Sequence, residues 1–145
     1  MKRICFFSVL LLTLLAVGCN NNVPLKGKVY FNDDHSPLTT GIVIFDNGTQ
    51  SGRANIESDG SFIVGFEENQ NGIPAGTWRL AIGGAVKRLP CPENEDIDTK
   101  NDVYPWPCEQ LIDSKYESVD TSDLSITVDK NTKTFEIGVD RPSQK

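Results

Sequence analysis

Residues 41–66 read GIVIFDNGTQSGRANIESDGSFIVGF, and no other stretch says as much about the architecture of the chain. It contains three short segments, 41–45, 52–56 and 61–66, separated by turn residues, which is typical of an all-β protein. The first segment is a continuous apolar run, and it suits a strand that is buried on both faces. Ser58-Asp59-Gly60 joins the other two segments, and Asp-Gly between two strand patterns predicts a β-hairpin.

Similar segments recur on both sides of this stretch. Residues 26–31 and 77–82 each predict a strand, and residues 72–76 predict the turn before the second of them. Two final segments are predicted to form a hairpin across Asp129-Lys130-Asn131, namely 124–128 and 134–139. About seven strands at regular spacing predict an all-β fold, a seven-stranded antiparallel β-sandwich with Ig-like architecture.

Alternate side chains of a strand share one face, and we expect one face of each strand to be buried. The predicted core residues are Val29, Phe31, Ile42, Ile44, Phe62, Val64, Trp78, Leu80, Ile126, Val128, Phe135 and Ile137.

The N-terminus predicts an export signal. Lys2 and Arg3 form a cationic head, an apolar run follows, and small residues close it before Cys19. Residues 6–17 would rise only about 18 Å as a helix, whereas the hydrocarbon core of a bilayer is about 30 Å thick. A transmembrane span is therefore excluded for this segment.

The junction Ala16-Val17-Gly18-Cys19 resembles a bacterial lipobox, although Leu is commoner than Ala at position 16. This resemblance implies that residues 1–18 are a cleaved lipoprotein signal peptide and that Cys19 carries the lipid. The alternative is a plain secretory signal followed by an ordinary cysteine. Asn20 is not the aspartate that retains lipoproteins at an inner membrane, so we expect a lipid-anchored protein of the cell envelope. The outer membrane is favoured if the cell has two.

The charge of the chain excludes some partners. Its formal net charge is −6, and removal of a signal that holds two cations and no acid makes it −8. Nucleic acid is not expected as a partner, because binding it requires a basic patch. An overall acidic chain is also not expected to hold an anionic membrane by charge alone, so the lipid must anchor it.

Two cysteines remain in the mature domain besides Cys19. Cys91 and Cys108 form an even pair in an oxidising compartment, which predicts a disulfide bond. It would close a loop of about seventeen residues and contribute on the order of 3 kcal/mol. The alternative, a metal or redox pair, lacks both the CxxC spacing and a second histidine beside His35.

One irregular stretch, residues 90–114, interrupts the strand pattern. Its acidic half is not an EF-hand, because position six from Asp96 is Asn101 and position twelve is Pro107. In its second half, Tyr104 and Trp106 each directly precede a proline, which is consistent with a rigid aromatic binding platform for a sugar or a peptide. The other interpretation is a lid over one end of the sandwich, pinned by the disulfide.

Short motifs follow one another along the chain in a fixed order. They are VPLKGKV (23–29), SPL (36–38), GIVIF (41–45), SDGSF (58–62), GIPAGTW (72–78), KY (115–116) and SDLSITV (122–128). This ordered set resembles the small, planctomycete-type bacterial lipoproteins with a carboxypeptidase regulatory-like, transthyretin-like domain. The resemblance implies a transthyretin-like seven-stranded sandwich without established catalytic residues, and the 91–108 segment is an insertion relative to it.

These observations predict a domain organisation. Residues 1–18 are the signal, 19–24 the lipidated cysteine and a short tether, 25–140 the sandwich with its Cys-closed insertion at 91–108, and 141–145 a frayed tail.

The residue types present point away from common catalytic sites. A catalytic zinc needs three protein ligands, which typically include two or three histidines, and His35 is the single histidine of the chain. A serine triad would also need His35, and the chain has no Gly-x-Ser-x-Gly elbow. We therefore expect no cofactor, no metal and no catalytic residues. The expected function is a non-catalytic binding or structural module for an envelope protein or glycan; the alternative is a small surface-tethered hydrolase that uses carboxylates.

Overall fold

The computed structural model describes residues 22–65, 72–90 and 107–143, and the chain is all-β, as the sequence predicts. The helical element of these residues is one 3₁₀ turn, η2 (Ser114–Glu117). Among the described residues, no helix is long and apolar enough to cross a membrane. The strands are β1 (Asn22–Val23), β2 (Leu25–Phe31), β3 (Ile42–Asp46), β4 (Ser51–Asn55), β5 (Ser61–Val64), β6 (Ile73–Pro74), β7 (Gly76–Gly83), β8 (Val86–Arg88), β9 (Cys108–Gln110), β10 (Ser125–Val128) and β11 (Thr134–Val139).

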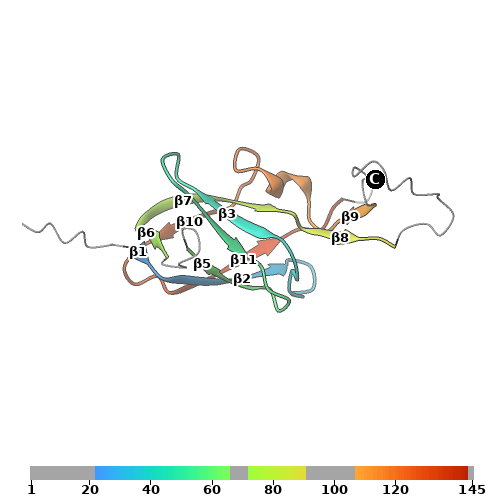
Figure 1. Ribbon diagram of the computed structural model, residues 1–145, viewed down its shortest axis with the longest axis horizontal. Helices are drawn as coiled ribbons and strands as arrows, with labels where there is room; N and C mark the ends of the chain where they lie inside the picture. The colour runs from blue at the N-terminus through green and yellow to red at the C-terminus, as the bar shows by residue number, and fades with distance from the viewer. Residues whose placement is uncertain (1–21, 66–71, 91–106, 144–145) are drawn as a thin grey trace, which may run out of the picture.

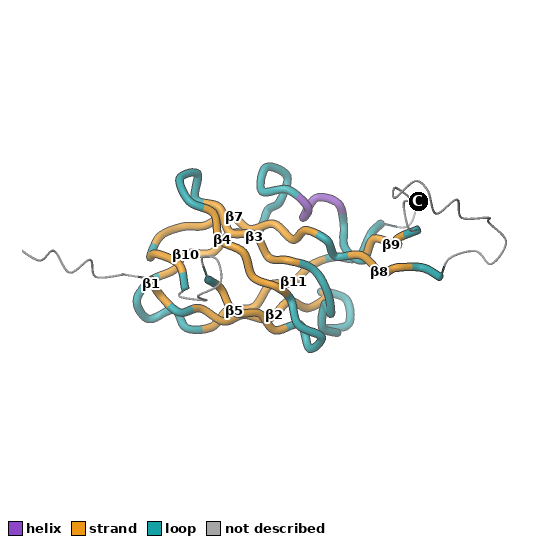
Figure 2. The backbone as a smooth tube through the Cα atoms, in the orientation of Figure 1, coloured by secondary structure: helices purple, strands orange, loops and turns teal. Residues whose placement is uncertain are grey.

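Two larger sheets make up the body of the molecule (Figure 1). One has the strand order β10-β7-β3-β4 and is antiparallel throughout. The other has the order β11-β2-β5, and its β11 runs parallel to β2. In Figure 2, β7, β3 and β4 run along one side of the body and β2 and β5 along the other. The prediction of an entirely antiparallel fold is therefore wrong at one strand pair.

The core between the sheets contains a cluster of three aromatic rings. Phe45 of β3 lies 6.3 Å from Phe62 of β5 and 6.2 Å from Phe135 of β11, measured between ring centroids. Phe62 and Phe135 meet edge to face at 5.4 Å. Gly27 of β2 is paired with both of these residues, and a Cβ atom built on Gly27 would overlap the Phe62 ring. The missing side chain of Gly27 thus provides the space that the Phe62 ring fills.

Each segment of the two predicted hairpins contains a strand, but the strands of the 124–139 hairpin do not pair with each other. β10 pairs with β7 and β11 with β2, so residues 129–133 cross from one sheet to the other. The predicted 52–66 hairpin forms in part: the Glu57 amide donates to the Ser61 carbonyl at 2.8 Å, and Arg53 bridges Gly65 in the same antiparallel register. Between these two points, β4 pairs with β3 and β5 pairs with β2. Two consecutive strands that share a tight turn and each have an apolar face can pair with each other in one sheet. They can equally lie in two sheets that face each other across the core. Here both apolar faces point into the same core.

The predicted burial of β3 is also wrong. Val43 and Phe45 are fully buried, whereas Ile42 is 36% exposed and Ile44 is half-buried. The strand is buried on one face instead of two, and its inner face is one residue out of phase with the predicted one. The unbroken apolar run contains no polar residue that could have fixed this phase.

The other predicted core positions lie inside. Ile126 and Phe135 are partly buried and pack against the core, and the rest are buried: Val29, Phe31, Phe62, Val64, Trp78, Leu80, Val128 and Ile137.

Short strands that the sequence did not predict form at the two ends of the body. β1 pairs with β6 where the chain enters, and its Val23 is buried, so part of the predicted tether belongs to the fold. Residues 73–74, predicted as turn, form β6. β8 pairs with β9 in a two-stranded ribbon that extends from the opposite end of the body (Figure 1).

Candidate functional site

The β8–β9 ribbon carries the insertion that the sequence singled out. Arg88 pairs with Cys108, and the Leu89 amide donates to the Pro107 carbonyl at 2.9 Å, so the strands stay paired up to the last described residues. Cys108 is exposed at the start of β9. The ribbon and β1 lie at opposite ends of the long axis of the body (Figure 1).

Most of the predicted site residues lie outside the described residues. These are Cys19, Cys91, Tyr104 and Trp106. The lipid attachment, the Cys91–Cys108 disulfide and the aromatic platform therefore remain predictions.

The C-terminal segment forms a polar cluster with the end of β2 and the turn after it. Arg141 Nε donates to Asp33 Oδ2 at 2.9 Å, and Arg141 Nη2 donates to Asp34 Oδ2 at 2.9 Å. The guanidinium carbon also lies 3.8 Å from the centroid of the Phe31 ring, a cation–π contact. Arg141 Nη2 also donates to the Ser36 hydroxyl at 3.1 Å. Arg141 is thus held by four side chains at the end of β2 and in the turn after it, and the predicted frayed tail is wrong at this position.

The carboxylates of this cluster are held in their ionised form. The hydroxyl and backbone amide of Ser36 donate to Asp34, and with Arg141 they lower the pKa of Asp34 to about 2. Asn32, Tyr116 and Lys115 donate to Asp140 at 2.7, 2.8 and 3.2 Å. These three bonds lower the pKa of Asp140 to about 2.

A general acid requires the opposite shift. A carboxyl that donates a proton near neutral pH needs a pKa raised by burial or by a neighbouring negative charge. Wherever a carboxylate pKa departs clearly from its ordinary value in the described residues, it is lowered, and the donors are turn amides, hydroxyls and neighbouring side chains. These carboxylates tie turns and strand ends together.

The described residues offer no ready metal site. No group of three His, Cys, Asp or Glu side chains in residues 22–65, 72–90 and 107–143 could hold an ion. His35 lies in the turn after β2 with a φ of 55°, and its ring lies 5.2 Å from that of Tyr30.

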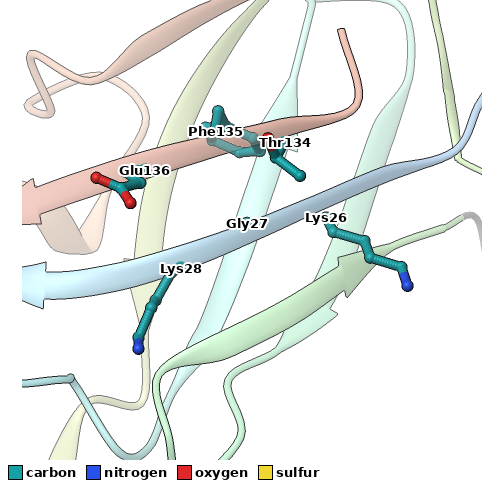
Figure 3. A pocket seen from close by; sticks show the side chains of 6 residues that line it. All are labelled: Lys26, Gly27, Lys28, Thr134, Phe135 and Glu136. Carbon is teal, nitrogen blue, oxygen red and sulfur yellow. The ribbon is translucent and has the colours of Figure 1, made fainter.

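A shallow groove lies along the outer face of the three-stranded sheet (Figure 3). It has a volume of about 360 Å³ and is lined by β2 and β11. Lys26 and Lys28 are exposed and alternate with buried residues of β2, so they lie on the outer face of the sheet. Figure 3 shows both lysine side chains extending away from β11, which contributes Thr134 and Glu136 to the groove. This open, charged surface suits contact with a large partner more than enclosure of a small molecule.

Sequence reasoning missed the polar cluster around Arg141 and Asp140. The pairing of Val139 with Phe31 brings Asp140 beside Asn32, and Arg141 beside Asp33 and Asp34, across more than a hundred residues of chain. No local motif marks a parallel pairing between the first and last long strands. The available signal was Asp140-Arg141 directly after the last predicted strand. Such a pair indicates polar contacts but does not identify the residues that make them.

Comparisons with known proteins add little. No family model matches the chain, and no curated protein matches it. Among solved structures, a 9R-lipoxygenase from Cyanothece PCC8801 is similar over 81% of this chain and 16% of its own, with 15% sequence identity and a TM-score of 0.33. The chain spans about a sixth of the length of that protein, and a likeness at this TM-score carries no argument about fold or function.

Proposed function

We propose that this protein is a lipid-anchored lipoprotein of the cell envelope that acts as a non-catalytic binding or structural module for a protein or glycan. The observation that carries the proposal is the position of β1 and the β8–β9 ribbon at opposite ends of the body. Asn22, three residues after Cys19, lies at one end of the body, and the β8–β9 ribbon projects from the other (Figure 1). An anchor at Cys19 would hold the first end at a membrane and leave the ribbon facing outward.

The fold we propose is the seven-stranded, transthyretin-like sandwich that the motifs resemble. Seven strands in the two larger sheets support it, with β1, β6, β8 and β9 as additions. The parallel pairing of β11 with β2 modifies the expected antiparallel arrangement.

The electrostatics favour binding over hydrolysis. Asp34 and Asp140 accept several hydrogen bonds each, and their pKa values fall to about 2. The alternative function, a carboxylate hydrolase, needs one carboxyl with a raised pKa near a second one. A binding module needs only a stable body and an exposed surface.

The anchor is tested by metabolic labelling with an alkynyl fatty acid. Cys19→Ser should abolish labelling and accumulate the uncleaved precursor. Cys5→Ser, inside the predicted signal, is the matched control and should label like the wild type. Undiminished labelling of the Cys19→Ser protein would contradict the anchor.

The orientation of the module is tested by photo-crosslinking in cells. A benzophenone amino acid at Lys87, exposed in β8, should cross-link to the partner. The same residue at Thr49, exposed in the turn between β3 and β4, is the control and should not. Cross-links from Thr49 and none from Lys87 would place the binding surface away from the ribbon.

A further inference from the structure

A second hollow lies at the end of the body where the chain enters. It has a volume of about 320 Å³ and lies beside the exposed Pro24 and Ile63, which is 41% exposed on the outer face of β5. Three exposed lysines also line it, and none of its lining residues is acidic. We call this surface the basic end; its lining residues are Val23, Pro24, Leu25, Lys26, Ile63, Lys130, Thr132, Lys133 and Thr134.

Backbone bonds fix the lysines of the basic end near one another. The Lys26 amide donates to the Lys133 carbonyl at 3.1 Å, which joins the start of β2 to the turn before β11. Within that turn, Asp129 Oδ1 accepts from the amides of Asn131 and Thr132, each at 2.8 Å. The turn that carries Lys130 and Lys133 is therefore held in one conformation beside Lys26.

This local charge is opposite to that of the protein as a whole. The chain is acidic, yet Lys26, Lys130 and Lys133 line a single hollow, and Lys28 follows on the adjoining outer face of β2. Among the described residues, the acids beside these lysines are Asp129, whose carboxylate is engaged in the turn, Glu136, which lines the neighbouring groove, and Asp59, which interacts with Lys28. The basic end therefore presents a cationic rim beside apolar side chains.

The position of the basic end close to Cys19 indicates that it faces the membrane. Val23 and Pro24 line the hollow, and Asn22 precedes them directly. Asn22 follows Cys19 by three positions along the chain, which sets a maximum reach of about 10 Å. A lipid on Cys19 would therefore hold the basic end against the headgroups of its own membrane. This step rests on the proposed lipid anchor.

We propose that the basic end docks on anionic lipid headgroups, with Lys26, Lys130 and Lys133 as the contacting cations. Lysines at a membrane surface attract anionic lipids and bury their stems along apolar neighbours, here Pro24 and Ile63. Each such lysine strengthens binding about fivefold at physiological ionic strength. The lipid provides attachment, and the basic end fixes orientation, so the ribbon points away from the membrane.

The test uses the mature lipidated protein reconstituted into vesicles. One set contains phosphatidylcholine alone, and the other contains phosphatidylcholine with phosphatidylglycerol. A membrane-impermeant acetylating reagent then labels the lysines, and mass spectrometry gives the rate at each position. On the anionic vesicles, acetylation of Lys26, Lys130 and Lys133 should fall roughly fivefold relative to neutral vesicles. Lys87, in the distal ribbon, should react equally on both.

High salt and two double variants test whether the protection of Lys26 is electrostatic. At 1 M salt the screening length falls to about 3 Å, and the protection of Lys26 should disappear. Lys130→Gln/Lys133→Gln should also remove it, whereas Lys87→Gln/Arg88→Gln should leave it intact. Equal acetylation of Lys26 on both kinds of vesicle would overturn the docking proposal while the lipid anchor stands. Failure of the protein to bind neutral vesicles at all would instead overturn the anchor.

Discussion

Gly27 offers a direct test of how the core is packed. It lies in β2 opposite Phe62 and Phe135, and a Cβ atom there would overlap the Phe62 ring. Phe62 is only 1% exposed and lies between the rings of Phe45 and Phe135, so it has little room to move. Gly27→Ala should therefore destabilise the domain by about 1–3 kcal/mol, the usual cost of overpacking.

The size of this effect should depend on the Phe62 ring. Phe62→Ala alone should cost about 3–5 kcal/mol, because it removes a buried ring and leaves a cavity. Gly27→Ala added to Phe62→Ala should cost nothing further. It should even recover a few tenths of a kcal/mol, because alanine restricts the unfolded chain more than glycine does. The two substitutions should thus be coupled by about 1–3 kcal/mol in a double-mutant cycle.

Urea unfolding followed by circular dichroism measures these differences, with the slope of the transition checked for constancy. Gly83→Ala in β7 is the matched control. A Cβ atom there lies 3.6 Å from its nearest neighbour, Ile44 Cδ1, so its cost should be near zero. A neutral Gly27→Ala, or costs that add in the double variant, would refute the packing of Phe62 over Gly27.

Three further predictions concern the surface of the molecule. Because the folded pKa values of Asp34 and Asp140 are lowered to about 2, the stability that these groups contribute is present above about pH 4 and lost as the pH falls toward 2. The urea midpoint should drop across that window, and Asp140→Asn should make the drop smaller; an unchanged profile in the variant would contradict the role of Asp140. If Cys91 and Cys108 form the predicted disulfide, dithiothreitol should lower stability by about 3 kcal/mol, whereas two free thiols in oxidised protein would exclude the bond. If the insertion is a binding platform, Trp106→Ala should abolish partner capture with little change in melting temperature; a lower melting temperature with capture intact would identify a lid instead.

Local patterns in the sequence sufficed to locate the main strands. The alternation of Trp78, Leu80 and Ile82 with exposed or small residues marks the inner face of β7, and all three are buried. In residues 41–45 the same reasoning fails, because four apolar residues in a row carry no period-two signal. The pairing of β3 with both β4 and β7 determines which side chains point inward, and a local pattern does not contain that pairing.

The sheet assignment of the strands could not be predicted for a related reason. Turn residues at 58–60 and 129–131 predict where the chain reverses, and both turns form. Whether a reversal continues one sheet or crosses to the facing one depends on strands far away in the chain. The parallel pairing of β11 with β2 is such a long-range choice, and it also assembles the cluster around Arg141. The central site prediction, Cys19, rests on the signal that precedes it.

Mass spectrometry of the N-terminal peptide of the mature protein tests the central claim most directly. The account predicts that the purified membrane form begins at Cys19 and that this residue carries a diacylglyceryl group on its sulfur. A mature protein whose first peptide extends upstream of Cys19, or whose Cys19 is unmodified, would contradict the account.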